Sequence, residues 1–283
     1  MSPIPEYPVL GLSLGAIYGL MAVPLSLVFS TTGTMDLAIG GYAVFGGLAG
    51  ATIGGVAGAL AGLAIGALAG GLMGGVFLAL QGRSSGDHMA PVLASVGLLF
   101  SLVALTQASF GVDPVFVPLF EVVWEIGPLR IRPVSVLTLA VVLVVGAVLV
   151  VGLRRTQLGR WMRACASSPR DAELMGIPVH RVQLAAFVLS GLLGGLGGLL
   201  LVSSRGLAFD AGLPLALLGL GALIIFGMRG PVTAIVGGLV LGVVESFGAG
   251  YLPATVVPIV PLLFILLVLA TGRFDVHVGV ARP

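Results

Sequence analysis

Lysine is absent from the 283-residue chain, and cysteine occurs once, as Cys165. Without lysine there is no Walker A loop, whose lysine contacts the phosphates of a bound nucleotide. A single cysteine excludes an intramolecular disulfide. The three histidines, His88, His180 and His277, are far apart in the sequence, so we predict no metal site. No Ser-His-Asp ordering or carboxylate pair indicates catalysis, and we predict no enzyme activity.

Charged residues are scarce: they make up 8% of the chain, against 58% apolar residues, and the mean hydropathy is +1.19. No charge occurs between Asp36 and Arg83, an interval of 46 residues. A membrane-spanning helix needs only ~20 apolar residues. Because lipid requires the backbone to satisfy its own hydrogen bonds, such runs predict an all-α, polytopic membrane protein. The small net charge of +2 indicates no nucleic-acid partner.

Glycine is abundant, and in the uncharged interval it recurs at every fourth residue. In lipid, small residues at this spacing form a smooth stripe that lets two helix backbones touch. As one helix, the 46 residues would be about 69 Å long, roughly twice the hydrocarbon thickness. We therefore predict two antiparallel spans that turn near Gly54 and Gly55. The predicted close-packing residues are Gly46, Gly50, Gly54, Gly58, Gly62, Gly66, Gly70 and Gly74.

Apolar runs along the chain predict eight or nine transmembrane helices, of which the short segment 213–228 is the weakest and reads as a half-helix. If the segment 154–181 is cytoplasmic, ten of the thirteen arginines lie inside the cell. Arginine-rich loops favour the cytoplasmic side, so we predict the N-terminus outside and the C-terminus inside. The predicted spans are 9–29, 36–54, 56–81, 90–110, 133–153, 182–203, 213–228, 231–249 and 257–272.

We predict that residues 1–283 form a single transmembrane domain with two long connecting loops. The outer loop, 111–132, alternates apolar and polar residues around Gly127 and Pro128, which predicts a small β-hairpin. The cytoplasmic loop, 154–181, contains six arginines together with two acidic residues.

A short amphipathic helix is predicted inside the cytoplasmic loop. Ser168 followed by Pro169 is a helix-start signal, and Gly176 is an end signal. One interpretation of the basic loop is that it only sets the orientation and contacts anionic lipid headgroups. A second interpretation is that the loop docks onto a cytosolic partner, and the presence of a dedicated short helix between two spans favours it.

Three blocks resemble the LivH-type permeases of branched-chain amino acid ABC importers: GLSLGAIYGLMAVPLSLVF, RTQLGRWMRACASSPRDAELMGIPVHRVQLAAFVLSGLLGGLGGLLL and GPVTAIVGGLVLGVVESFGAGYL. The resemblance implies a type II-like ABC importer permease fold in the bacterial or archaeal cytoplasmic membrane, carrying an amino acid or related small polar solute. It implies four kinds of partner: membrane lipid, a LivM-like or identical second permease, an extracytoplasmic solute-binding protein, and two cytosolic ATPases. ATP and Mg would be bound by those ATPases, with no cofactor on this chain.

The middle block is the most specific part of the resemblance. In that family the equivalent segment forms the coupling helix that sits on the ATPase. We expect charged contacts with the ATPase from the arginines and acidic residues of the block, the alternative being that they form a solvated face. The predicted coupling residues are Arg163, Ala164, Ser168, Arg170, Asp171, Ala172, Glu173 and Gly176.

The segment after the first span departs from the family pattern. The family reads Asn-Phe-Ala-His-Gly there, whereas this chain reads TTGTMDLAIGG, with Asp36 and Ile39 at the corresponding positions. The stretch is closer to the Gly-x-x-Asp-Leu-x-x-Gly signature of related sugar permeases. A sugar or another small solute is therefore the alternative ligand.

The same segment supplies candidates for the translocation pathway. TTGTMD interrupts the helical pattern and would expose backbone groups, as broken helices do in transporters. An ionisable residue within a span is a functional candidate by default. The pathway candidates are Thr34, Asp36, Gly40 and Glu245. Alternatively, Asp36 caps the following helix, and Glu245 makes a buried hydrogen bond to a neighbouring helix.

A secondary transporter, a channel or a membrane scaffold subunit would share this composition and these glycine stripes. Ion-coupled transporters more often carry charges near the middle of the membrane, and the predicted spans are nearly free of them. Association with ATPase subunits would distinguish these classes.

Overall fold

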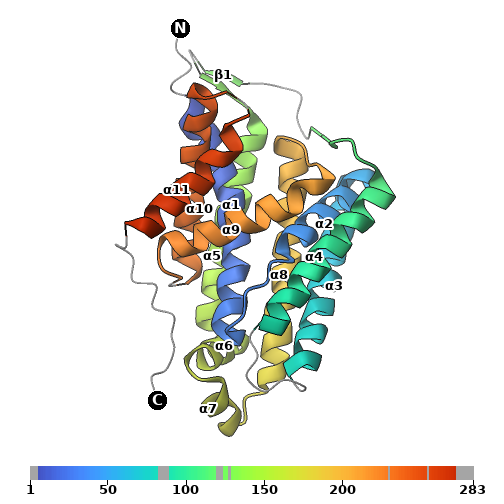
Figure 1. Cartoon of the computed structure of the whole chain (residues 1–283), viewed down its shortest axis with the longest axis vertical. Coiled ribbons are helices and arrows are strands. Elements are labelled where there is room, and N and C mark those ends of the chain that lie inside the picture. The colour runs from blue at the N-terminus through green and yellow to red at the C-terminus, as the bar shows by residue number, and fades with distance from the viewer. Residues whose placement is uncertain are drawn as a thin grey trace.

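The computed structural model describes residues 6–81, 89–118, 124–126, 129–228, 230–253 and 255–271. Its described regular elements are helices, apart from one two-stranded hairpin (Figure 1). The α-helices are α1 (Glu6–Thr32), α2 (Ile39–Ile53), α3 (Gly55–Gln81), α4 (Met89–Phe110), α5 (Pro133–Arg155), α6 (Gln157–Ser167), α7 (Pro169–Leu174), α8 (Val179–Ser204), α9 (Gly212–Ile225), α10 (Pro231–Tyr251) and α11 (Val260–Ala270). The shorter elements are β1 (Trp124–Ile126), β2 (Leu129–Ile131) and the 3-10 turns η1 (Phe209–Ala211) and η2 (Val257–Ile259).

Within the described ranges, six helices are long and apolar enough to cross a membrane: α1, α3, α4, α5, α8 and α10. Three further apolar helices are shorter, namely α2 with 15 residues, α9 with 14 and α11 with 11. The nine predicted spans thus correspond to six long and three short helices. The weakest predicted span is the short helix α9, which runs obliquely across the bundle (Figure 1).

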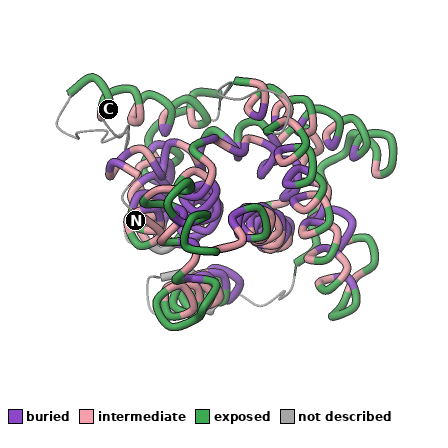
Figure 2. The backbone as a smooth tube through the Cα atoms, turned by 90° about the horizontal axis from the view of Figure 1, so that it is seen from below, coloured by how far each residue is buried: buried purple, intermediate pink, exposed green. Residues whose placement is uncertain are grey.

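Two helices form the centre of the bundle. In α1, 83% of the most apolar window is buried, and in α8 67%, whereas the value is 28% for α3, α4 and α5. Helix α1 packs mainly against α10, and α8 packs mainly against α2 and α3. Contacts between α1 and α8 join these two groups. Figure 2 shows the buried segments facing one another inside the bundle, with exposed segments around the outside.

Glycine backbones make the contact among α2, α3 and α8. A Cβ atom on Gly46 would lie 2.8 Å from the carbonyl oxygen of Gly62, and real Cβ atoms do not approach closer than 3.0 Å. Added Cβ atoms on Gly66 and Gly191 would overlap each other's carbonyl oxygens. Six of the eight predicted packing glycines meet a neighbouring backbone in this way: Gly46, Gly50, Gly58, Gly62, Gly66 and Gly70. A seventh, Gly74, packs instead against the side chains of Leu184 and Phe187.

Gly54 is the exception to the predicted stripe. It lies between α2 and α3 with φ +73°, and an added Cβ there would meet no atom within 4 Å. Gly55 follows with φ +59°. The left-handed region is readily open only to glycine, so Gly54 serves the predicted turn and not the packing.

A second glycine contact joins α1 to α10. A Cβ on Gly15 would lie 2.6 Å from the carbonyl oxygen of Gly238 and 2.7 Å from the Cα atom of Leu239. Gly11 and Gly19 face the same helix one turn away on either side. In lipid, packing of this kind takes the place of the hydrophobic driving force between helices.

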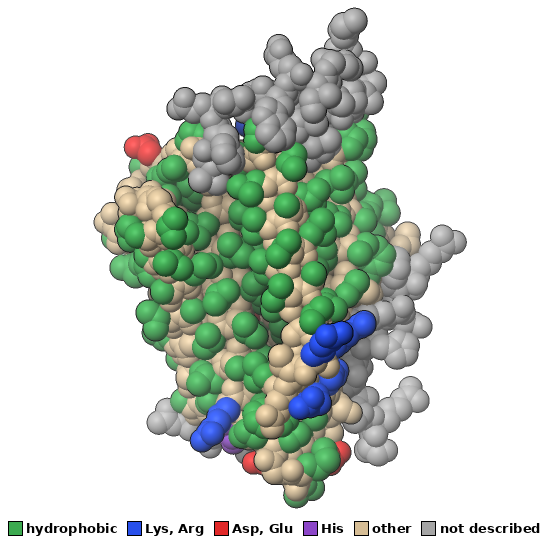
Figure 3. All heavy atoms as spheres, turned by 180° about the vertical axis from the view of Figure 1, so that it is seen from behind, with side chains coloured by type: hydrophobic (Ala, Val, Ile, Leu, Met, Phe, Trp, Pro, Cys, Tyr) green, Lys and Arg blue, Asp and Glu red, His purple; other side chains and the backbone are tan. Residues whose placement is uncertain are grey.

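The outer surface is apolar, in contrast to that of a soluble protein. Large hydrophobic side chains of α3, α5 and α11 point outward; Leu68, Val148 and Leu266 are 73%, 65% and 65% exposed. Figure 3 shows hydrophobic side chains over most of the height of one face, with basic side chains near one end. The inside of α3 therefore carries glycine and its outside carries leucine and valine, the arrangement expected of a helix that faces lipid.

The connecting segments lie at opposite ends of the bundle. Strands β1 and β2 pair antiparallel, with Trp124 opposite Ile131 and Ile126 opposite Leu129, so the predicted hairpin is present. Gly127 and Pro128 lie outside the described residues. An isolated bridge between Val115 and Leu207 ties the same outer loop to the chain after α8. Helices α6 and α7 lie at the other end (Figure 1).

Candidate functional site

Two short helices, α6 and α7, form the end of the molecule opposite the β-hairpin, and a side-chain cap begins each of them. Thr156 begins α6 by accepting a 3.2 Å hydrogen bond from the backbone nitrogen of Gly159. Ser168 begins α7 in the same way, with the nitrogen of Asp171 at 3.2 Å, and Pro169 occupies the first helical position. Gly176, with φ +78°, follows the end of α7. The helix that was predicted from Ser168, Pro169 and Gly176 is therefore present.

The predicted coupling residues divide into an exposed set and a buried set. Ala172 is fully buried, and it holds α7 against the bundle. Ala164 and Ser168 are half-buried. The other five are exposed to solvent: Arg163, Arg170, Asp171, Glu173 and Gly176.

Two apolar residues at the tip of α7 were not among the predicted coupling residues. Leu174 is 82% exposed and Met175 is 70% exposed. Figure 1 shows α7 at the far end of the molecule, beyond the ends of the long helices. Large apolar side chains exposed beyond the apolar spans, next to charged ones, are typical of a surface that a protein partner covers. The signal in the sequence was the Leu-Met pair at the end of an otherwise polar segment.

Arg163 has an internal contact that the sequence did not indicate. Its Nη1 atom donates a hydrogen bond to the carbonyl oxygen of Leu153, near the end of α5. Gly159 of α6 also lies against Leu153, so closely that a Cβ there would overlap the Leu153 backbone. Arg163 thus ties α6 to the end of α5 through one guanidinium nitrogen.

Helix α6 connects this end to the core. Its buried residues Met162 and Cys165 belong to the main hydrophobic core, together with Ala172 of α7. Helix α6 contacts α1, α5 and α8. A displacement of α6 and α7 would therefore be transmitted directly to the central helices, because a packed core does not deform continuously.

The break between α1 and α2 surrounds a buried carboxylate. Asp36 is 1% exposed. Its Oδ1 atom accepts a hydrogen bond from the nitrogen of Ala38 at 3.1 Å, and its Oδ2 atom accepts from Ser190 Oγ and Tyr42 Oη, both at 3.2 Å. The nitrogen of Leu37 donates to Ser95 Oγ of α4 at 3.2 Å. The backbone nitrogens of Leu37 and Ala38 thus find side-chain acceptors inside the protein. Asp36 does not cap α2 as an N-cap residue, because that position is Ala38; its carboxylate instead joins the start of α2 to Ser190 of α8.

Two pathway candidates lie on either side of Asp36. Thr34 is buried and its hydroxyl lies 3.0 Å from that of Thr32. At Gly40, an added Cβ would overlap the carbonyl oxygen of Gly212. The first turns of α2 and α9, two of the short helices, therefore meet backbone to backbone inside the bundle.

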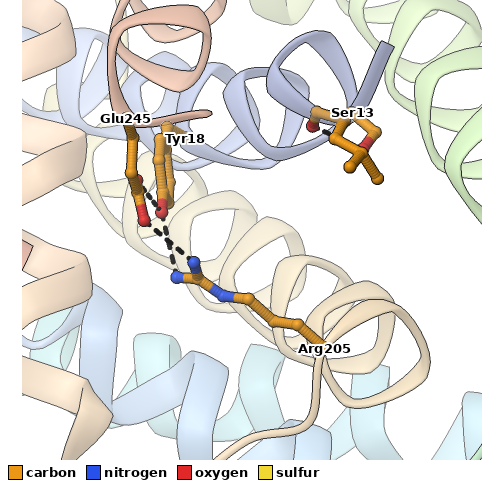
Figure 4. Close-up of polar contacts among 5 residues, drawn as sticks. Ser13, Tyr18, Arg205 and Glu245 are labelled. Atoms are coloured by element: carbon orange, nitrogen blue, oxygen red, sulfur yellow. Dashed lines mark hydrogen bonds and ion pairs between the residues drawn. The ribbon is translucent and has the colours of Figure 1, made fainter. Parts of the chain in front are cut away.

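Glu245 belongs to a polar triad that joins three helices (Figure 4). Arg205 Nη1, at the end of α8, donates to Glu245 Oε1 of α10 at 3.0 Å, and Arg205 Nη2 donates to Tyr18 Oη of α1 at 2.9 Å. The Tyr18 hydroxyl donates to Glu245 Oε2 at 2.6 Å. The Glu245 side chain is 9% exposed and that of Arg205 41%. Tyr18 and Arg205 were not predicted as site residues, because no local pattern connects positions so far apart in the sequence.

Among the described residues, no three histidine, cysteine, aspartate or glutamate side chains are grouped so that they could hold a metal ion. His88 and His277 lie outside the described residues. The acidic and basic side chains of the bundle interior instead form the Asp36 cluster and the Tyr18–Arg205–Glu245 triad.

A family comparison matches almost the whole chain. The family described as "Branched-chain amino acid transport system / permease component" covers residues 7–270. The chain belongs to this family. The resemblance seen in the three sequence blocks is confirmed, and so is the all-α polytopic fold class.

Curated relatives in the permease family are similar over most of their length. The high-affinity branched-chain amino acid transport system permease protein LivH of Escherichia coli K12 is 27% identical over 93% of this chain and 92% of its own length. BraD of Pseudomonas aeruginosa, a protein of the same description, is 26% identical over 84% of both chains. A nucleoside ABC transporter permease protein, NupC of Lactococcus lactis, is 28% identical over 42% of this chain and 40% of its own.

A solved structure supports the fold. A chain of PsaBC from Streptococcus pneumoniae, determined in complex with Fab, superposes with a TM-score of 0.55 over 96% of this chain and 94% of the other. The sequence identity is 14%, so this likeness concerns the fold alone.

Proposed function

We propose that this chain is the membrane-spanning permease subunit of an ATP-driven importer, in the cytoplasmic membrane of a bacterium or archaeon, and that residues 1–283 act as one permease domain. The observation that carries the proposal is the tip of α7, where Leu174 and Met175 are exposed beside Arg170 and Glu173. Family membership supports it. The chain has no lysine and hence no Walker A loop, so ATP and Mg would be bound by two separate cytosolic ATPase subunits.

In this proposal α6 and α7 transmit the motion of the ATPases. The apolar tip and its flanking charges would insert into a groove of an ATPase. When ATP draws the two ATPases together, α7 would move with them, and α6 would shift the inner ends of α1, α5 and α8. A second permease subunit, either identical or LivM-like, would complete the pathway, and an extracytoplasmic binding protein would deliver the solute.

Two sets of polar contacts join helices of the bundle, and in this proposal they are made in one state of the cycle and broken in the other. The Tyr18–Arg205–Glu245 triad holds α1, α8 and α10 together at the end opposite α7. Asp36 holds the start of α2 against α8. We propose that the pathway passes near Thr34, Asp36, Gly40 and Glu245, and that separation of these contacts accompanies its opening.

The proposed solute is a branched-chain amino acid or a related small polar compound, as the names of LivH and BraD indicate for those proteins. The alternative is a sugar or nucleoside. It is favoured by the stretch from Gly33 to Gly40, which matches Gly-x-x-Asp-Leu-x-x-Gly, and by the partial similarity to a nucleoside permease. Separate measurements of the uptake of labelled leucine, labelled ribose and labelled uridine in proteoliposomes distinguish these classes.

The proposal is tested with the double variant Leu174→Ser, Met175→Ser. We expect loss of the ATPase subunits on co-purification and loss of ATP-driven uptake in proteoliposomes, with an unchanged elution volume and unfolding temperature. The matched control is Val112→Ser, Phe116→Ser, because these side chains are 57% and 51% exposed at the opposite end. ATP-driven uptake at the wild-type rate by the α7 variant would refute the coupling role. Uptake driven by an ion gradient without any ATPase would instead identify a secondary transporter.

A further inference from the structure

A pocket of about 380 Å³ opens near the inner end of the bundle. Its walls come from four parts of the chain that are distant in sequence: the last turns of α1 and α5, one face of α6, and Met228 with residues 230–233 at the start of α10. Arg154 and Arg163 both line it, and none of the described lining residues is acidic. The remaining lining atoms are largely apolar, from side chains such as Leu27, Val150 and Val232.

The ends of three predicted membrane spans show where the pocket lies across the membrane. The span of α1 ends at Thr32, that of α5 ends at Arg155, and that of α10 begins at Pro231. Because the apolar surface of all three helices stops there, the pocket lies at the level of the lipid headgroups on the side of α6 and α7. A ligand there would meet charge at one end and hydrocarbon at the other.

The donors in the pocket suit a phosphate group. Arg163 uses Nη1 for the carbonyl oxygen of Leu153, so the rest of its guanidinium remains for a second acceptor. Arg154 is exposed, and it makes no hydrogen bond or ion pair with another described residue. The hydroxyls of Ser30 and Thr233 donate to the carbonyl oxygens of Leu27 and Gly230. Among the described lining residues, Arg154 and Arg163 are the cationic donors. Guanidinium groups pair with phosphate oxygens in a fixed, bidentate geometry.

We propose that this pocket binds one anionic phospholipid, with its phosphate between Arg154 and Arg163 and the first part of an acyl chain along Val150 and Val232. Basic pockets between transmembrane helices at the cytoplasmic surface are known sites for acidic lipid headgroups. The lipid would connect α5, α6 and the start of α10. The site therefore joins the proposed coupling segment to the membrane itself, independently of which solute is transported.

The test uses the full-length chain in detergent, with any subunits that co-purify, and the lipids phosphatidylglycerol and phosphatidylcholine. Retained lipid is measured by native mass spectrometry, and stabilisation by the thermal unfolding midpoint. Phosphatidylglycerol should be retained and should raise the midpoint, and phosphatidylcholine should do neither. Arg154→Gln should weaken retention about tenfold, because one charge-assisted hydrogen-bonded contact is lost.

The matched controls are Arg155→Gln and Arg160→Gln, which remove the same charge from exposed positions that do not line the pocket. They should retain phosphatidylglycerol at the wild-type level. Equal loss in all three variants would show a general attraction to the basic surface and overturn the proposal.

Val232→Trp fills the pocket without changing the charge and should also reduce retention. Inorganic phosphate at the same concentration should not raise the midpoint, and an equal rise would assign the pocket to a free anion and not to a lipid.

Discussion

Two regions of the molecule are held together differently. Backbone contacts join α2, α3 and α8, whereas side-chain contacts hold α6 and α7 in place. In the first, backbone meets backbone, as between Gly66 and Gly191, and a single added carbon would not fit. In the second, side chains make the structure: Ser168 caps α7, Ala172 anchors it, and Leu174 and Met175 remain exposed. The comparison shows where change is tolerated. The glycine contact permits almost no substitution, because an added carbon atom would overlap a neighbouring backbone. Leu174 and Met175 are 82% and 70% exposed, so replacing them should leave the fold unchanged.

Gly66→Leu should have the largest effect, because its Cβ would overlap the carbonyl oxygen of Gly191. We expect a loss of stability at or above the ~3 kcal/mol upper end of ordinary overpacking, since a helix backbone yields less than a side chain. The measurement is the yield of monodisperse protein in detergent and its unfolding midpoint. The control is Gly75→Leu in the same helix, where nothing lies within 4 Å of an added Cβ. Equal yields for the two variants would contradict the backbone contact.

Arg205→Met should have the next largest effect, because it leaves the Glu245 carboxylate buried without its cation. Breaking a fully buried pair costs ~3–5 kcal/mol. We expect less here, since Arg205 is 41% exposed and solvent screens the pair. The double variant Arg205→Met, Glu245→Met should recover part of the loss, and the cycle is measured by denaturant unfolding. Strictly additive losses would show that the two side chains do not interact.

Ser168→Ala tests the second region by removing the cap of α7. Loss of a serine N-cap costs about 1 kcal/mol, and we expect that cost to appear locally, as faster hydrogen exchange in residues 169–175. Ser167→Ala, one residue earlier, removes an exposed hydroxyl that caps no helix and should leave the exchange unchanged. Unchanged exchange in Ser168→Ala would mean that packing through Ala172 alone maintains the helix.

Glu173→Cys should have the smallest effect on stability, within ~0.5 kcal/mol, because the position is exposed. In right-side-out vesicles an impermeant maleimide should not label it, whereas it should label Val112→Cys at the other end. The maleimide should not label the native Cys165 in either variant, because this residue is fully buried. Burial also raises the pKa of its thiol, which lowers the fraction of reactive thiolate. The reverse labelling pattern would invert the predicted orientation.

Much of the architecture was predictable because lipid imposes it. Uncharged runs such as the one after Asp36 must become helices, since an unsatisfied backbone is too costly in hydrocarbon. The four-residue glycine spacing predicted close packing because helical periodicity places these positions on one face. The start and end of α7 followed from Ser168, Pro169 and Gly176, whose preferences act over a single turn. Gly54 was predicted both to form the turn and to belong to the packing stripe, and the structure supports only the turn. The four-residue spacing includes Gly54 by position, although the helix ends before it.

The sequence alone determined that this is a polytopic helical membrane protein, located its apolar helices to within a few residues, and showed that it lacks a Walker A loop, because these properties depend on composition and on residues within a few turns of one another. It did not predict α6, whose mixed charged and apolar residues were assigned to a loop, and it began the second apolar helix at residue 36, whereas α2 begins at Ile39. The tertiary structure decided which groups meet across the bundle. It brought Tyr18, Arg205 and Glu245 together from three helices, paired Gly40 with Gly212, and placed Arg154 and Arg163 around one pocket. Such contacts follow from the relative placement of whole helices, which no local spacing encodes.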